Sequence, residues 1–189
     1  MGHKRIDDEP EAPDDGSDET SRIPLAGRLV SGALAGIVAT LPMTGAMRRL
    51  HRGLETEDRY PLPPREIIGS AAPGLRRASA PDITIAAHFA YGAACGAGLA
   101  AVAPKPRLAA GVAGGLGIWV ASYLGWIPAF GILRAATRHP APRNRLMILS
   151  HLMWGAAYAV AQSEIVKSRA IFSGGPLRDT LRKRRGART

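Results

Sequence analysis

The sequence predicts an all-α, polytopic membrane protein with four transmembrane helices, which are built from a duplicated two-helix unit and flanked by disordered polar tails. The first observation behind this prediction is a set of uncharged runs in the middle of the chain. They cover residues 29–47, 83–104, 108–133 and 146–163. A hydrocarbon core roughly 30 Å thick requires about 20 helical residues. Because none of these runs has the polar face of a soluble amphipathic helix, we expect them to lie in a membrane.

The second observation is that two short motifs occur twice. The motif His-x-x-aromatic-Gly-Ala-Ala begins at His88 and again at His151. The motif Pro-x-x-Gly-x-x-Arg begins at Pro42 and again at Pro128. In each half of the chain the proline motif closes one apolar run and the histidine motif opens the next, so the sequence indicates a duplicated pair of helices. Two copies with the same orientation would be related by a pseudo-twofold axis along the membrane normal.

Charge divides the chain into three parts. We expect an acidic disordered tail over residues 1–22, a transmembrane domain over 23–166 and a basic tail over 167–189. Each tail carries a high net charge, which is typical of disorder. Within the transmembrane domain, helices are expected at about residues 25–48, 82–104, 107–134 and 145–166.

The net charge of +10 at pH 7 suggests two kinds of anionic partner, nucleic acid and lipid. No aromatic residue interleaves with the basic run over residues 178–188, so stacking on bases has no support. We therefore expect no nucleic-acid partner, and we expect anionic lipid of the bilayer to bind the C-terminal basic tail. Attraction of that tail to the anionic cytoplasmic leaflet favours both termini in the cytoplasm.

Glycine is frequent in the apolar runs and predicts close helix packing. Apolar side chains gain little by leaving lipid for a neighbouring helix, so close backbone approach supplies packing energy instead. The expected packing positions are Gly32, Gly36, Gly92, Gly96, Gly111, Gly115 and Gly155. Such small-residue faces also predict a homo-oligomer. Pro42 and Pro128 lie near the ends of the first and third helices, and each is expected to kink its helix because proline lacks a backbone donor.

The repeat predicts a polar layer near one membrane surface. Each histidine shares a helix face with the aromatic residue three positions later. The two arginines of the proline motif end the preceding helices at the same membrane face. The predicted layer consists of His88, His151, Arg48 and Arg134, with Tyr91 and Trp154 beside the histidines. An alternative for the arginines is that they only anchor helix ends at the interface.

Three hypotheses for the histidine pair stay open. Each imidazole could hydrogen-bond a neighbouring helix and hold the bundle together. The histidines and arginines could instead belong to a substrate, proton or anion pathway. The two histidines could also ligate a haem iron. Otherwise we expect no cofactor and no metal, since Cys95 is the only cysteine and paired carboxylates are missing from the apolar runs. We expect no enzymatic activity, because the sequence contains no nucleophile–base arrangement or phosphate-binding loop.

Two further stretches carry a family resemblance. The sequence Pro-Leu-Pro-Pro-Arg at residues 61–65 predicts extended backbone, with a short interfacial helix from Glu66 onward. Together with Ser-His-Leu-Met-Trp at residues 150–154, it resembles the YagU-like family of small bacterial inner-membrane proteins, whose biochemical activity is not established. The resemblance covers roughly residues 24–168. It implies an inner-membrane location and supplies no catalytic residues, and both charged tails depart from the family pattern.

Three functions follow as expectations. The first is a small transport or membrane and pH homeostasis protein that uses the histidine and arginine layer. The second is a non-catalytic membrane scaffold or assembly protein whose tails dock partners. The third is an electron carrier with a haem held by two histidines.

Overall fold

The computed structural model describes residues 23–59, 61–71, 74 and 80–172, and every regular element in these ranges is helical. The predicted all-α class is therefore confirmed for this part of the chain. The predicted tail over residues 1–22 lies outside the described residues, as does the predicted basic tail from residue 173 onward. The elements are α2 (Leu25–Arg52), η1 (Thr56–Asp58), α3 (Pro63–Ala71), α4 (Ala80–Val102), α5 (Leu108–Val120), η2 (Ala121–Trp126), α6 (Ile127–Ala129), η3 (Ala136–Arg138) and α7 (Ala141–Phe172).

Three helical segments are long and apolar enough to cross a membrane. They are Leu25–Arg52, Pro81–Val102 and Leu108–Ala129. The chain is therefore compatible with an integral membrane protein. The longest helix, α7, is not among them because Ser150, His151 and Gln162 interrupt its apolar sequence. All three of these polar side chains are buried inside the bundle, so they lower the hydropathy of α7 without being exposed on its outer face.

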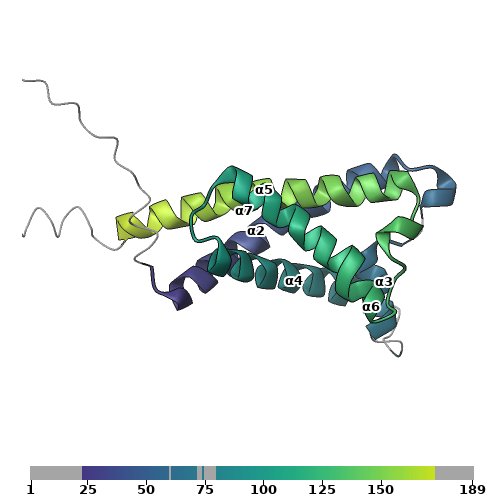
Figure 1. Cartoon of the computed structure of the whole chain (residues 1–189), viewed down its shortest axis with the longest axis horizontal. Helices are drawn as coiled ribbons and strands as arrows, with labels where there is room; N and C mark the ends of the chain where they lie inside the picture. The colour runs from purple at the N-terminus through teal and green to yellow at the C-terminus, as the bar shows by residue number, and fades with distance from the viewer. Residues whose placement is uncertain (1–22, 60, 72–73, 75–79, 173–189) are drawn as a thin grey trace, which may run out of the picture.

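The long helices pack as antiparallel neighbours (Figure 1). Helix α2 packs along both α4 and α7, and α5 packs along the other side of α7. The beginning of α2 and the end of α7 lie at one end of the bundle, while α3 and α6 lie at the opposite end, which we call the α3 end. Helices α4 and α5 meet mainly through side chains, such as Leu99 against Gly114.

Glycines allow the helix backbones to touch in the half of the bundle away from the α3 end. A Cβ at Gly96 would lie 2.8 Å from the Cα of Gly36, so α2 and α4 could not hold their present separation with a larger residue there. The α5–α7 pair has a similar contact, because a Cβ at Gly155 would lie 2.9 Å from the Cα of Val112. Backbones packed this closely gain dispersion energy that lipid cannot supply.

The remaining predicted packing glycines lie in the same two contacts. Gly32 and Gly36 of α2 face the backbone carbonyls of Gly96 and Gly92, respectively. Gly111 and Gly115 of α5 face the carbonyls of Gly155 and His151. These contacts together contain all seven glycines expected from the sequence.

The two helix pairs have matching glycine contacts, but their proline motifs do not lie at matching positions relative to those contacts. Gly36 and Gly111 occupy matching places, because each faces the carbonyl of the glycine in a histidine motif. Gly36 precedes Pro42 by six residues, whereas Gly111 precedes Pro128 by 17. At 3.6 residues per turn, this difference displaces the second proline motif by about three turns relative to the first.

The two prolines have different consequences. Helix α2 continues through Pro42 to Arg52, beyond the end expected at residue 48. The third helix was expected to reach residue 134, but regular α-helix ends at Val120, a π-helical turn follows and α6 ends at Ala129. Within that turn Gly125 has non-helical angles (φ −108°, ψ −110°). The ring of Pro128 would clash with the carbonyl four residues earlier, which accounts for a distortion at this place.

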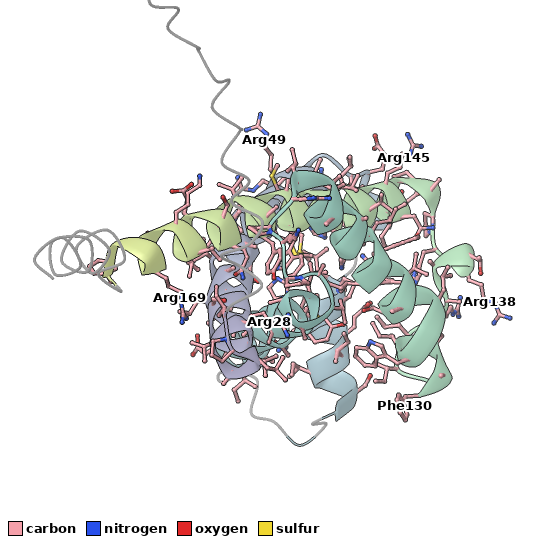
Figure 2. The ribbon with its side chains drawn as sticks, turned by 60° about the vertical axis from the view of Figure 1, so that its left-hand side comes forward. Arg28, Arg49, Phe130, Arg138, Arg145 and Arg169 are labelled. Carbon is pink, nitrogen blue, oxygen red and sulfur yellow. The ribbon has the colours of Figure 1, made fainter. Side chains whose placement is uncertain are left out.

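The boundaries of α4 and α7 also differ slightly from the prediction. Helix α4 spans Ala80–Val102 instead of about 82–104. Helix α7 spans Ala141–Phe172 instead of 145–166, so the first six residues of the predicted basic tail are helical. Charged side chains lie toward the bundle ends, where Arg49, Arg138 and Arg145 point away from the helices (Figure 2).

Candidate functional site

An inner cavity of about 270 Å³ lies between the helices toward the α3 end. Its walls come from α2, α3, α4, the α5–α6 region and α7. Both predicted histidines and both aromatic residues of the repeated motif line it: His88 and Tyr91 from α4, and His151 and Trp154 from α7. Methionine, isoleucine and proline side chains make most of the remaining wall, so the cavity is mainly apolar.

His151 is buried and held in one tautomer. Its Nδ1 lies 2.8 Å from the carbonyl oxygen of Met147, and because a carbonyl only accepts, Nδ1 carries the proton. The other ring nitrogen, Nε2, is then a lone-pair acceptor in the neutral imidazole. The ring of Tyr123 packs edge-to-face against His151, with 6.2 Å between centroids. The α7 backbone and Tyr123 therefore orient this imidazole at the cavity wall.

His88 has a different environment. Its Nε2 is buried and has no hydrogen-bond partner within the described ranges of the chain. A buried polar atom without a partner carries a free-energy penalty, and such atoms are common where a protein binds a ligand or ordered water. The ring of Phe89 packs edge-on against His88 at 6.2 Å.

The aromatic residues of the motif are tied to neighbouring helices. The hydroxyl oxygens of Tyr91 and Ser122 lie 2.8 Å apart, which links α4 to the π-helical turn after α5. The indole Nε1 of Trp154 donates to Oγ1 of Thr40 at 3.2 Å, which links α7 to α2. Trp154 also stacks on Tyr158, with 5.3 Å between centroids. The two aromatic residues therefore fix the helices that surround the cavity.

A second hollow of about 470 Å³ adjoins the inner cavity. We call it the basic vestibule, because its lining includes Arg48, His51, Arg59 and Arg65. His88 lines both hollows. The predicted neighbours Arg48 and His88 thus belong to the wall of one hollow.

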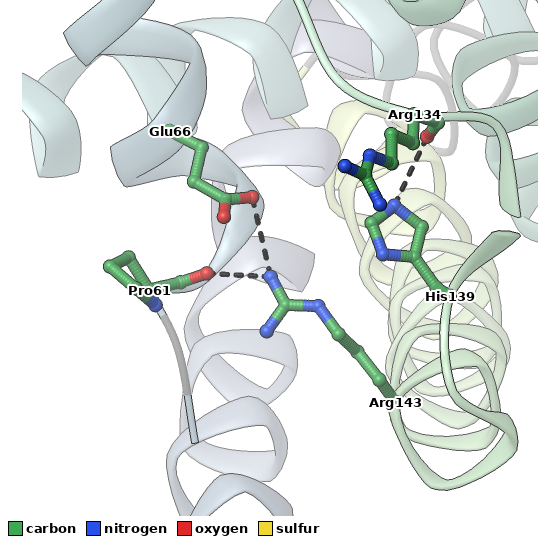
Figure 3. A network of polar contacts seen from close by, with 5 residues as sticks. All are labelled: Pro61, Glu66, Arg134, His139 and Arg143. Carbon is green, nitrogen blue, oxygen red and sulfur yellow. Dashed lines mark hydrogen bonds and ion pairs between the residues drawn. The ribbon is translucent and has the colours of Figure 1, made fainter. Parts of the chain in front are cut away.

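Arg134 does not contribute to the wall of either hollow. Its side chain is exposed on the loop between α6 and η3, and it lines neither hollow. Its backbone carbonyl accepts a hydrogen bond from Nε2 of His139 at 3.0 Å (Figure 3). The structure therefore does not bring Arg134 together with the histidines at either hollow, and its place in the predicted layer at one membrane face stays a prediction. The physical reason is that the third helix ends at Ala129 and that its proline motif is displaced along the bundle.

Arg143 is an important basic side chain that the sequence prediction missed. It is only 2% exposed near the start of α7, and its Nη2 donates to the Pro61 carbonyl at 2.5 Å and to Glu66 Oε2 at 3.3 Å (Figure 3). Burial raises the pKa of Glu66, while the charges of Arg143 and His139 oppose that rise. These contacts hold α3, which lines the inner cavity, against the start of α7. The Pro-rich stretch was recognisable in the sequence, but its partner 82 residues away was not.

The inner cavity has the composition of a small-molecule binding site. In the ranges that the structure describes, no group of three or more His, Cys, Asp or Glu side chains is placed to hold a metal ion. The lining of the inner cavity includes two histidines, two tyrosines, three serine or threonine residues and Cys95 within a mainly apolar wall. Apolar walls with a few convergent polar groups are typical of small-molecule sites.

A scan against protein-family models and searches of curated proteins and solved structures found no match to this chain. The resemblance to the YagU-like family therefore stays a prediction.

Proposed function

We propose that the chain is an integral protein of the bacterial inner membrane with four spans, in which α7 is the fourth. The burial of Ser150, His151 and Gln162 supports this proposal, since the exposed side chains of residues 146–163 are then all apolar. The similar glycine contacts of α2 with α4 and of α5 with α7 support descent from a duplicated two-helix unit. Four spans place both termini on one side, and the charge of the C-terminal segment favours the cytoplasm.

We further propose that the protein binds and transports a small solute, and thereby serves transport or membrane and pH homeostasis. The observation that carries this proposal is that His88 and His151 line one cavity inside the bundle and that His88 also lines the basic vestibule. Ionisable groups within a membrane domain are costly, and they are most often retained for a pathway. A solute could enter through the vestibule, pass His88 and reach His151.

Passage across the whole bundle requires a second opening. The glycine contacts close the bundle on the far side of the cavity. Helices α4 and α5 are the neighbours held together mainly by side chains, so a separation of this pair would break fewer close contacts than a separation of α2 from α4. We therefore expect alternating access in which α4 and α5 move apart.

Reconstituted proteoliposomes test the transport proposal. The measurement is the flux of protons and of small anions for the wild type and for His88→Ala with His151→Ala. We expect the double variant to lose at least about tenfold in flux, in line with loss of a required ionisable group. His139→Ala is the matched control, because His139 lines neither hollow. An unchanged flux in the double variant, or no flux in the wild type, would contradict the proposal.

The remaining hypotheses have separate tests. Two histidines on one cavity also fit a haem-bearing electron carrier, and a visible absorption spectrum of the purified protein decides this. A scaffold would depend on the tails, which lie outside the described residues except for 167–172. If removal of residues 1–22 and 173–189 abolishes function while the bundle stays folded, the scaffold hypothesis replaces transport.

A further inference from the structure

We propose that the solute is an amphiphilic anion taken from the bilayer, with a short apolar chain in the inner cavity and a phosphate or carboxylate head in the basic vestibule. This inference rests on the proposed binding function and names its substrate class. It follows from the adjacency, charge and size of the two hollows.

The two hollows are direct neighbours. Met47, Pro64, Thr84 and His88 line both of them, so the hollows share a wall made by α2, α3 and α4. In the proposed complex a single elongated molecule occupies both, with its polar end on one side of His88 and its apolar end on the other. The buried, unpartnered Nε2 of His88 adds a polar contact at this junction.

The vestibule is complementary to an anion. Three arginines and two histidines contribute to its lining, and none of its described lining residues is acidic. Arg48 and Arg65 are exposed, while Arg59 is fixed by hydrogen bonds to the carbonyls of Leu54 and Arg52. Guanidinium groups match the planar geometry of carboxylate and phosphate oxygens. The vestibule also lies where α2 ends and α4 begins, which is the depth of lipid headgroups for two spanning helices.

The inner cavity is complementary to a short apolar group. A cavity of about 150 Å³ with apolar walls can hold a benzene ring, so 270 Å³ suits a larger ring or a short chain. Tyr91 lines the cavity and is 40% exposed, which places one edge of the cavity at the outer surface of α4. That surface would face lipid, and Trp126 lies beside Tyr91 with 6.1 Å between ring centroids. An apolar chain could therefore enter laterally, past these two rings.

Binding by the full-length protein in phosphatidylcholine nanodiscs tests this inference. Three probes separate the contributions of head and chain: decyl phosphate, decanol and inorganic phosphate. Titration calorimetry against empty nanodiscs gives the dissociation constant. We expect decyl phosphate to bind at least about tenfold more tightly than either other probe, because only it fills both hollows.

Two variants locate the bound molecule. Arg48→Gln with Arg65→Gln should weaken decyl phosphate binding about tenfold and leave decanol binding unchanged. The matched control is Arg138→Gln with Arg145→Gln, since these exposed arginines line neither hollow and point away from the bundle (Figure 2). Ala87→Phe should fill the inner cavity and weaken both chain-bearing probes, with the unfolding temperature measured to verify that it folds.

Cys95 supplies an independent readout of occupancy. It is the only cysteine of the chain and it lines the inner cavity, so decyl phosphate should slow its alkylation by N-ethylmaleimide. Equal affinity for decanol, equal affinity for inorganic phosphate, or no saturable binding of decyl phosphate would each overturn the inference. Because proteoliposome flux of protons and small anions is measured separately, the transport proposal can survive this failure.

Discussion

The two halves of the bundle use the same four long helices in different ways. In the closed half, away from the α3 end, glycines bring α2 against α4 and α5 against α7 until their backbones touch. In the open half, toward the α3 end, methionine, tyrosine and tryptophan side chains surround the inner cavity. Residue size therefore decides where the helices touch and where they leave a cavity.

The irregular backbone of the bundle also lies in the open half. The distorted turn around Gly125 and the short α3 both belong to the open half, whereas the helices of the closed half are regular. Distorted backbone in a membrane domain is tolerated where it lines a cavity or is covered by protein. The closed half thus acts as a rigid support, and the open half carries the polar groups of the candidate site.

The largest loss of stability should come from adding one methyl group to a glycine contact in the closed half. In Gly96→Ala the new Cβ would lie 2.8 Å from the Cα of Gly36, and no rotamer change can relieve a contact with backbone. We expect a loss of about 3 kcal/mol in the free energy of unfolding, measured by denaturant titration in micelles. Gly98→Ala is the matched control, because nothing lies within 4 Å of its Cβ position. Equal stability of both variants would show that α2 and α4 are not tightly packed.

The next largest loss of stability should come from removing the Arg143 contacts that hold α3 in the open half. Arg143→Gln removes the donor to Pro61 and Glu66, and we expect a loss of about 2 kcal/mol in unfolding free energy. This is below the range for a fully buried pair because the Glu66 side chain is 22% exposed. Arg145→Gln, two residues away and exposed, should be neutral. If both variants behave alike, α3 does not depend on Arg143.

The sequence was sufficient for features set by local composition. Uncharged runs predicted the helical class and four spans, and three of the described helices are long and apolar enough to cross a membrane. Glycine spacing predicted positions that lie at the closest contacts. The sequence did not show that Arg134 would lie apart from both hollows, because a repeated motif does not fix the packing register of a helix pair. It also missed Arg143, whose partners lie 82 and 77 residues away. No local pattern encodes such a pairing.

A smaller effect should appear where the two halves meet. The hydrogen bond from Trp154 to Thr40 links α7 to α2 at the bottom of the inner cavity. A double-mutant cycle with Trp154→Phe and Thr40→Val should give a coupling of about 0.6 kcal/mol, the order of magnitude that such cycles give for hydrogen bonds between membrane helices. The measurement is the unfolding free energy of the four proteins of the cycle. A coupling near zero would mean that stacking on Tyr158 alone positions Trp154.

The smallest effect is a pH dependence of stability that comes from Glu66 in the open half. Burial raises the pKa of Glu66 above its ordinary value of 4.5, so the folded state binds this proton more tightly than the unfolded state does. Stability should therefore fall as the pH rises from below 4.5 through the raised pKa. The slope should vanish in Glu66→Gln and become steeper in Arg143→Gln, since the arginine charge favours the carboxylate. Unfolding temperatures measured across this pH range test the slope, and stability that rises with pH would show that the ion pair outweighs burial.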